Sequence, residues 1–225
     1  SIDNGKKLAI KGRDLKTLDE DVFKIDLFLT SLELSPDRQS CLNIKLNYLS
    51  LNIKNLQHLR ECILDTNSLK SIPSELSELT SLNRLVLSNN NLKSLPDSLG
   101  NLKNLKSLHL SKNYFEAIPD CIFQMESLSF IDFTSNSIKN LDQRLENLSK
   151  SLKIFYLYDN LIEELVVSHF INLTCLEDFW FGYNRIKVIP FEITNLKQLD
   201  WENNYYSTIF EKNPIQKPPI EVCKE

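Results

Sequence analysis

The residues that come nearest to a catalytic set in this sequence are Ser107, His109, Ser111 and Asp132. A hydroxyl, an imidazole and a carboxylate joined by hydrogen bonds form the triad that activates a serine for acyl transfer. Acyl transfer also needs donors that stabilise an oxyanion and a pocket that excludes water, and the residues around this set predict neither feature. We therefore expect His109 and Asp132 to form a surface pair, and we expect the chain not to be an enzyme.

The sequence does not indicate a metal site or a cofactor site either. The five cysteines are widely spaced and contain no CxxC pair, which argues against a zinc site of the usual kind. The four glycines are too scattered to form a glycine-rich loop that cradles a phosphate. We therefore predict no metal and no cofactor.

Charge, hydropathy and thiols indicate the class of partner and the surroundings. The net charge is −4, whereas a nucleic-acid-binding domain usually carries a basic patch, so we expect no nucleic acid as a partner. No apolar run approaches the roughly 18 residues that a membrane-spanning helix needs. The odd number of cysteines favours reduced thiols and a cytoplasmic location. A secreted or extracellular location is the alternative, because the sequons Asn147-Leu148-Ser149 and Asn172-Leu173-Thr174 are glycosylation motifs.

A repeat runs through almost the whole sequence, and it must position these side chains. Its clearest copy begins at Leu82 and follows the pattern LxxLxLxxNxL, with apolar residues at positions 1, 4, 6 and 11. Two weaker copies come first, one with Leu8 and Ile10 at positions 4 and 6 and the other with Leu32 and Leu34. The asparagines at position 9 follow one another at intervals of 23, 24 or 29 residues; they are Asn67, Asn90, Asn113, Asn136, Asn160, Asn184 and Asn213.

Each copy predicts a short strand, a turn and then an irregular or 3-10 segment. Side chains alternate along a strand, so positions 4 and 6 face a core and positions 3, 5 and 7 face outward. Stacked copies pair their strands into a parallel sheet with a spacing of about 4.8 Å. The asparagines must then bond backbone groups that the sheet leaves unpaired. Because no copy can bury its leucines alone, the stack is the folding unit.

This pattern resembles the leucine-rich repeat, and the Leu/Ile-Pro dipeptides after position 13 resemble its intracellular Ras-group type. These dipeptides are Ile72-Pro73, Leu95-Pro96, Ile118-Pro119 and Ile189-Pro190. The resemblance implies an α/β solenoid, or horseshoe, with a concave parallel β-sheet and convex 3-10 or short helical segments. We expect a single domain over 1–225, with degenerate repeats at 1–58, regular repeats at 59–204 and a terminal repeat at 205–225. Ras-group chains often continue into another domain, so a fragment of a longer protein is one interpretation.

The candidate binding site lies at outward positions of three consecutive predicted strands. The aromatic residues there are Phe130, Tyr156, Tyr158, Trp180 and Tyr183. The polar residues around them are Asp132, Asp159, Asp178 and His109. Exposed apolar patches usually mark interaction sites, and Trp and Tyr are common hot spots. The hypothesis is a protein partner with an apolar anchor flanked by Lys or Arg; the alternative is that the aromatic residues only stabilise adjacent strands.

We therefore predict a protein–protein interaction module, an adaptor or scaffold that binds its partner on the concave face. The family resemblance implies partners such as small GTPases or phosphatase subunits, although no residue of this chain selects one. One alternative is a targeting module of a larger signalling protein, a ubiquitin ligase or a bacterial effector. A second alternative is the ligand-binding fragment of an extracellular receptor.

Overall fold

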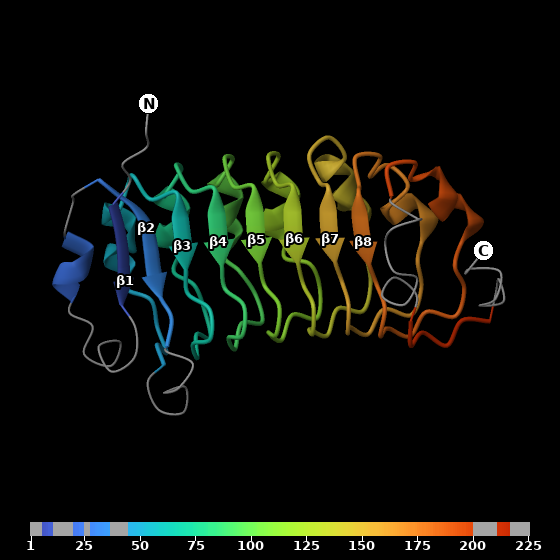
Figure 1. Cartoon of the computed structure of the whole chain (residues 1–225), viewed down its shortest axis with the longest axis horizontal. Coiled ribbons are helices and arrows are strands. Elements are labelled where there is room, and N and C mark those ends of the chain that lie inside the picture. Colours follow the sequence, from blue (N-terminus) through green and yellow to red (C-terminus); the bar gives the residue numbers. More distant parts are fainter. Residues whose placement is uncertain (1–5, 11–19, 25–27, 37–44, 200–210, 217–225) are drawn as a thin grey trace.

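The computed structural model describes residues 6–10, 20–24, 28–36, 45–199 and 211–216. Within them, eight parallel strands form one open sheet in the order of the sequence (Figure 1). The strands are β1 (Lys6–Ile10), β2 (Leu29–Leu34), β3 (Glu61–Ile63), β4 (Arg84–Val86), β5 (Ser107–His109), β6 (Phe130–Asp132), β7 (Ile154–Tyr156) and β8 (Asp178–Trp180). This arrangement confirms the predicted solenoid.

The register of the sheet is the one that the repeat predicts. Residues at position 4 pair with one another across every pair of neighbouring strands, as Leu85 of β4 does with Leu108 of β5. The degenerate first copy is also in register, because Leu8 pairs with Leu32. Position-4 and position-6 side chains from β2 onward are buried, whereas Leu8 and Ile10 of the edge strand are partly buried against the same core. One continuous core therefore runs along the stack.

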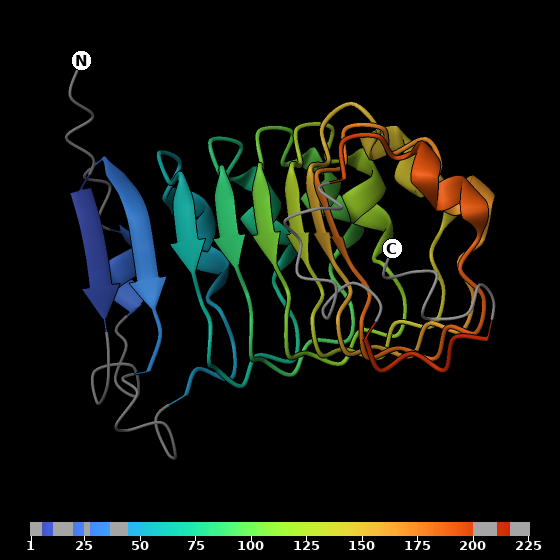
Figure 2. The ribbon, with the colours of Figure 1, turned by 45° about the vertical axis from the view of Figure 1, so that its right-hand side comes forward.

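Short 3-10 segments cover the side of the core opposite the sheet, and the stack curves so that the sheet is on the inner side (Figure 2). They are η2 (Glu20–Lys24), η3 (Leu51–Asn55), η4 (Ser74–Glu78), η5 (Asp97–Asn101), η6 (Asp120–Gln124), η7 (Gln143–Leu148), η8 (Val167–His169) and η9 (Phe191–Asn195). Each of the four prolines of the Leu/Ile-Pro dipeptides stands immediately before such a segment. Proline suits this place because its ring fixes φ and because it has no backbone N–H that would need a hydrogen-bond partner.

At the start of η7, Asp142 stands where four other repeats have proline, and its side chain caps the segment. Its carboxylate accepts a hydrogen bond from the backbone N–H of Arg144 at 2.8 Å. The Arg144 guanidinium then bonds Asp142 and reaches Asp120 of the preceding repeat at 2.9 Å. It also lies 4.4 Å from the ring centroid of Phe123. Ion pairs thus link exposed side chains of two neighbouring repeats, at the repeat that lacks the Leu/Ile-Pro dipeptide.

The asparagines form a ladder on the side of the stack where the strands end. In each repeat the amide oxygen accepts the backbone N–H of position 11 in the preceding repeat, as Asn113 Oδ1 does from Leu92 N at 3.0 Å. The amide nitrogen of Asn113 donates to the carbonyls of Leu87 and Leu110. The same bonds recur from Asn67 to Asn184, and most of these amides are buried. The ladder confirms the role predicted for position 9.

The residue before each ladder asparagine has a positive φ, although none of these residues is glycine. They are Thr66, Asn89, Lys112, Ser135, Asp159, Tyr183 and Lys212, with φ between 52° and 61°. A left-handed conformation costs roughly 1 kcal/mol for a residue with a Cβ. Because the asparagine bonds on either side of the turn require it, the backbone keeps this conformation whatever the side chain. The side chains at this position are therefore free to vary.

Some predictions lie outside the described residues. These are parts of the degenerate repeats at 1–58 and most of the terminal repeat at 205–225. Cys41 and Cys223 also lie there.

The buried cysteines allow a direct check of the core. Cys62 and Cys121 are free and buried, and burial raises the pKa of each thiol to about 12. At pH 8 only about one such thiol in ten thousand is ionised, and the thiolate is the reactive form. We expect iodoacetamide to label the half-buried Cys175 of the native protein well before Cys62 or Cys121, as read by peptide mass spectrometry. Equal labelling rates in the native protein, matching those in urea, would contradict the described core.

Candidate functional site

An aromatic row crosses the concave face from β5 to β8. The His109 ring lies 4.6 Å from that of Phe130, measured between centroids, and Phe130 lies 5.5 Å from Tyr156 in an edge-on arrangement. Tyr156 then stacks on Trp180 at 4.3 Å with an interplanar angle of 21°. The sequence predicted these residues for the open face, and the register places Asp132, Tyr156 and Trp180 opposite one another on adjacent strands. The row is thus continuous across four repeats.

A second aromatic pair borders this row, on the turns after β7 and β8. The rings of Tyr158 and Tyr183 lie 4.9 Å apart. The Tyr158 hydroxyl donates to Glu211 Oε1 at 2.8 Å, and Tyr183 is exposed. Glu211 was not among the residues that we selected from the sequence. Its place at position 7 of the terminal repeat was the only signal that could have indicated it, and an insertion in that repeat obscures the signal.

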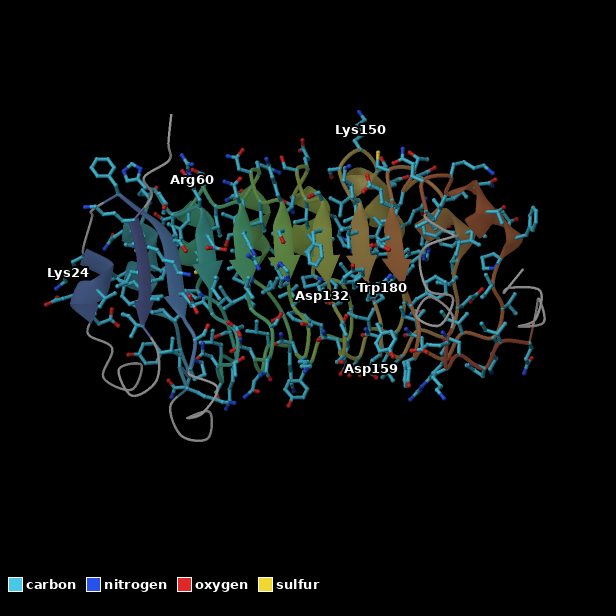
Figure 3. All side chains as sticks on the ribbon, viewed as in Figure 1. Lys24, Arg60, Asp132, Lys150, Asp159 and Trp180 are labelled. Carbon is cyan, nitrogen blue, oxygen red and sulfur yellow. The ribbon has the colours of Figure 1, made fainter. Side chains whose placement is uncertain are left out.

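Figure 3 shows Asp132 and Trp180 at the sheet, and the register places Asp178 at an outward position of β8, two residues before Trp180. Asp132 Oδ1 accepts the backbone N–H of Thr134 at 2.8 Å. Among the described residues, Asp178 Oδ1 has no hydrogen-bond partner and is shielded from solvent, and the same holds for Trp180 Nε1. Figure 3 also shows Asp159 below the sheet, on the turn after β7, beside the second aromatic pair. An unpartnered buried polar atom costs about 1–3 kcal/mol, so each one needs an explanation.

Tyr156 lies at the centre of this surface, which we call the aromatic surface and define as Phe130, Asp132, Tyr156, Asp178 and Trp180. Burial raises the pKa of the Tyr156 hydroxyl to about 12, and the negative charges of Asp178 and Asp132 act in the same direction. A side-chain hydrogen bond with Asp178 acts in the same direction, so the hydroxyl stays neutral throughout the physiological pH range.

The serine, histidine and aspartate singled out above do not form a relay. Ser107 Oγ and His109 Nε2 are 2.8 Å apart, but both residues belong to one strand. Ser111 donates to Ser88 at 2.9 Å instead. His109 and Asp132 are opposite one another in the sheet but make no hydrogen bond among the described residues. The contact between them is that of a surface pair, as the sequence indicated.

The environment of His109 predicts a pH dependence. Its pKa is lowered, first by burial and then by the charge of Arg84, against a smaller opposite effect of Asp132. Because the unfolded chain then binds the proton more tightly, the free energy of unfolding should fall as the pH decreases through the unfolded value near 6.5 and stay level above it. A proton NMR titration of the His109 ring should give a pKa below that value. A measured pKa above 6.5 would contradict the described packing, and His109→Gln should flatten the stability profile between pH 7 and 5.

Two other classes of site were sought in the described residues. No group of three or more histidine, cysteine, aspartate or glutamate side chains there is placed to hold a metal ion. No helix in the described part of the chain has the length and apolar character to cross a membrane.

Comparison with known proteins places the chain among repeat proteins. The family described as "Leucine-rich repeat region" matches residues 32–181. A search of curated protein sequences found no significant match. Among solved structures, a leucine-rich repeat protein of Leptospira interrogans superposes with a TM-score of 0.75 at 28% identity, over 97% of this chain and 64% of that one. This chain thus spans less than two thirds of that protein's length.

More distant structures share the fold. The ectodomain of the plant receptor kinase GASSHO1/SCHENGEN3 from Arabidopsis thaliana, solved in complex with CASPARIAN STRIP INTEGRITY FACTOR 2, gives a TM-score of 0.69 at 23% identity, covering 87% of this chain and 22% of that one. An internalin from Listeria monocytogenes gives 0.68 at 21% identity, covering 92% of this chain and 62% of that one. With the sheet, the ladder and the match over residues 32–181 in agreement, this chain belongs to the leucine-rich repeat family.

Proposed function

We propose that this chain is a protein-recognition module, an adaptor or scaffold without a catalytic step of its own, and that its partner binds the concave face over β5 to β8. Leucine-rich repeat proteins are generally protein–protein interaction modules. The observation that carries the proposal for this chain is the aromatic row from His109 to Trp180. Aromatic side chains on an open sheet face are typical of binding hot spots.

The alternative role for the aromatic row is packing between strands, and two observations favour binding over it. Packing alone would be served by full burial, yet Phe130, Tyr156 and Trp180 are only half-buried. Partly exposed aromatic rings gathered on one face are typical of interaction sites. The plant receptor ectodomain with the same fold is also described in complex with another protein factor.

The partner's identity and the location are further parts of the proposal. The free thiols of Cys62, Cys121 and Cys175 support a cytoplasmic location. The Ile/Leu-Pro dipeptides before the 3-10 segments support a Ras-group type of module, for which a small GTPase or a phosphatase subunit is the first class of partner to test.

A pull-down from cell lysate with mass-spectrometric identification tests this function. The wild-type chain is run beside Tyr156→Ala/Trp180→Ala of verified fold. We expect a protein that is captured by the wild type and lost with the double variant. Proteins captured equally by both chains would move the binding site away from the aromatic surface and overturn the proposal.

A further inference from the structure

Acidic side chains on the concave face have different surroundings in the two halves of the stack. On β2 and β3 the outward glutamates are paired within the chain, since Glu33 pairs with Lys7 at 3.0 Å and Glu61 pairs with Arg84 at 3.1 Å. In the C-terminal half Asp132 is at outward position 5 of β6 and Asp178 is at outward position 3 of β8. Among the described residues, no lysine or arginine forms an ion pair with either of them. Within the described part of the chain, the glutamates of β2 and β3 thus have counter-ions on this face, whereas Asp132 and Asp178 have none.

The unpaired carboxylates flank a π surface. Tyr156 lies on β7, between the strands of Asp132 and Asp178, and stacks on Trp180. Asp132 lies opposite Tyr156 in the register, whereas Asp178 lies opposite Ile154. Both carboxylates are near enough for their charges to act on the Tyr156 hydroxyl, so a ligand group beside that hydroxyl is close to both. Aromatic faces attract cations, and the attraction grows when water is excluded. Carboxylates and aromatic rings therefore favour the same ligand charge at the same place.

We propose that the anchor of the partner is an arginine side chain, which lies on the Tyr156–Trp180 stack and bonds Asp132 and Asp178. This inference rests on the proposed function and specifies the chemistry that its concave face recognises. The sequence alone indicated an apolar anchor with flanking cations; we infer the reverse, because the rings pack on one another and no cation pairs with Asp132 or Asp178 among the described residues. A guanidinium is preferred to an ammonium, because it is planar, stacks on rings and donates in several directions within its plane.

The first experiment selects peptides from a phage-displayed library of random dodecamers on the immobilised wild-type chain. We expect enriched peptides that share an arginine and that fail to bind Tyr156→Ala/Trp180→Ala. The enriched peptide is then synthesised with arginine and with citrulline, which keeps the shape and removes the charge. Calorimetry should show at least about a tenfold weaker affinity for the citrulline peptide, in line with the loss of a charge-assisted contact.

Matched variants of the protein complete the test. Asp132→Asn/Asp178→Asn should weaken the arginine peptide by a similar factor and leave the citrulline peptide unchanged. Glu61→Gln, whose carboxylate is already paired with Arg84, should leave both affinities unchanged. Thermal unfolding of each variant verifies the fold.

These experiments distinguish a failure of the arginine anchor from a failure of the proposed concave binding site. If enriched peptides require Tyr156 and Trp180 but lack arginine, or if citrulline binds equally well, the arginine anchor is wrong and the concave binding site stands. If no peptide is enriched, or if the enriched peptides bind the Tyr156→Ala/Trp180→Ala variant as they bind the wild type, both proposals are overturned.

Discussion

Replacing Asn113 by alanine is expected to lower the free energy of unfolding by about 2–4 kcal/mol, a large change for a single substitution. The Asn113 amide accepts from Leu92 N at 3.0 Å and donates to the carbonyls of Leu87 and Leu110 at 3.0 and 3.1 Å. Alanine removes all three bonds. The Leu92 N–H is then left buried and unpaired, which costs about 1–3 kcal/mol. The carbonyls of Leu87 and Leu110 each keep one donor, from Asn90 and Asn136. The side chain is only 6% exposed, so water cannot replace the bonds without opening the turn.

Urea unfolding followed by circular dichroism measures this loss. Asn91→Ala is the matched control, because Asn91 is a nearby half-buried asparagine whose side chain makes no hydrogen bond among the described residues. We expect the control to change the free energy of unfolding by less than about 0.5 kcal/mol. Similar losses for the two variants would mean that the ladder does not carry the stability assigned to it.

The second large effect is expected on binding. Tyr156→Ala/Trp180→Ala should weaken the affinity for the partner by about a hundredfold or more, since hot-spot aromatic residues contribute roughly 2 kcal/mol each. The two rings stack on one another, so after a single substitution the remaining ring could move into the space of the other. Removing both rings prevents this. The fold should persist, because position 5 lies on the open face whereas the neighbouring Phe155 and Phe179 fill the core.

Calorimetric titration of the captured partner gives the affinity. The control is Tyr114→Ala/Phe191→Ala, which removes two exposed aromatic side chains outside the aromatic surface. Its affinity should match that of the wild type. A comparable loss in the control would show that the partner spans other faces of the stack, and an unchanged affinity in the Tyr156→Ala/Trp180→Ala variant would exclude the aromatic surface.

Repetition explains why so much of the fold could be predicted. A leucine at position 4 of one copy leaves several interpretations open, but the same spacing in successive copies leaves only a stacked sheet. The register of Leu8 with Leu32 and the bonds of the asparagine ladder followed from that stack without further information. The aromatic residues could also be placed, because side-chain alternation along a three-residue strand decides which side faces the core.

The remaining features depend on distances that a repeat pattern does not contain. The unpartnered atoms of Asp178 and Trp180 arise from how closely neighbouring side chains pack, and the contrast with the Glu61–Arg84 pair depends on rotamers. The bond from Tyr158 to Glu211 joins residues 53 positions apart across an irregular repeat. At η7 the sequence has Asp142 in place of the proline, but the cap that its side chain forms with Arg144 N depends on the rotamer.

Site-specific photo-crosslinking tests the central claim most directly, because it records which face touches the partner. p-Benzoylphenylalanine is placed at residue 130 in one chain and at the exposed residue 191 in another, and each is irradiated in lysate before mass spectrometry. We predict that the partner is crosslinked to the chain with the photo-reactive group at residue 130 and is not crosslinked to the chain with that group at residue 191. A partner crosslinked only from residue 191 would contradict binding on the concave face.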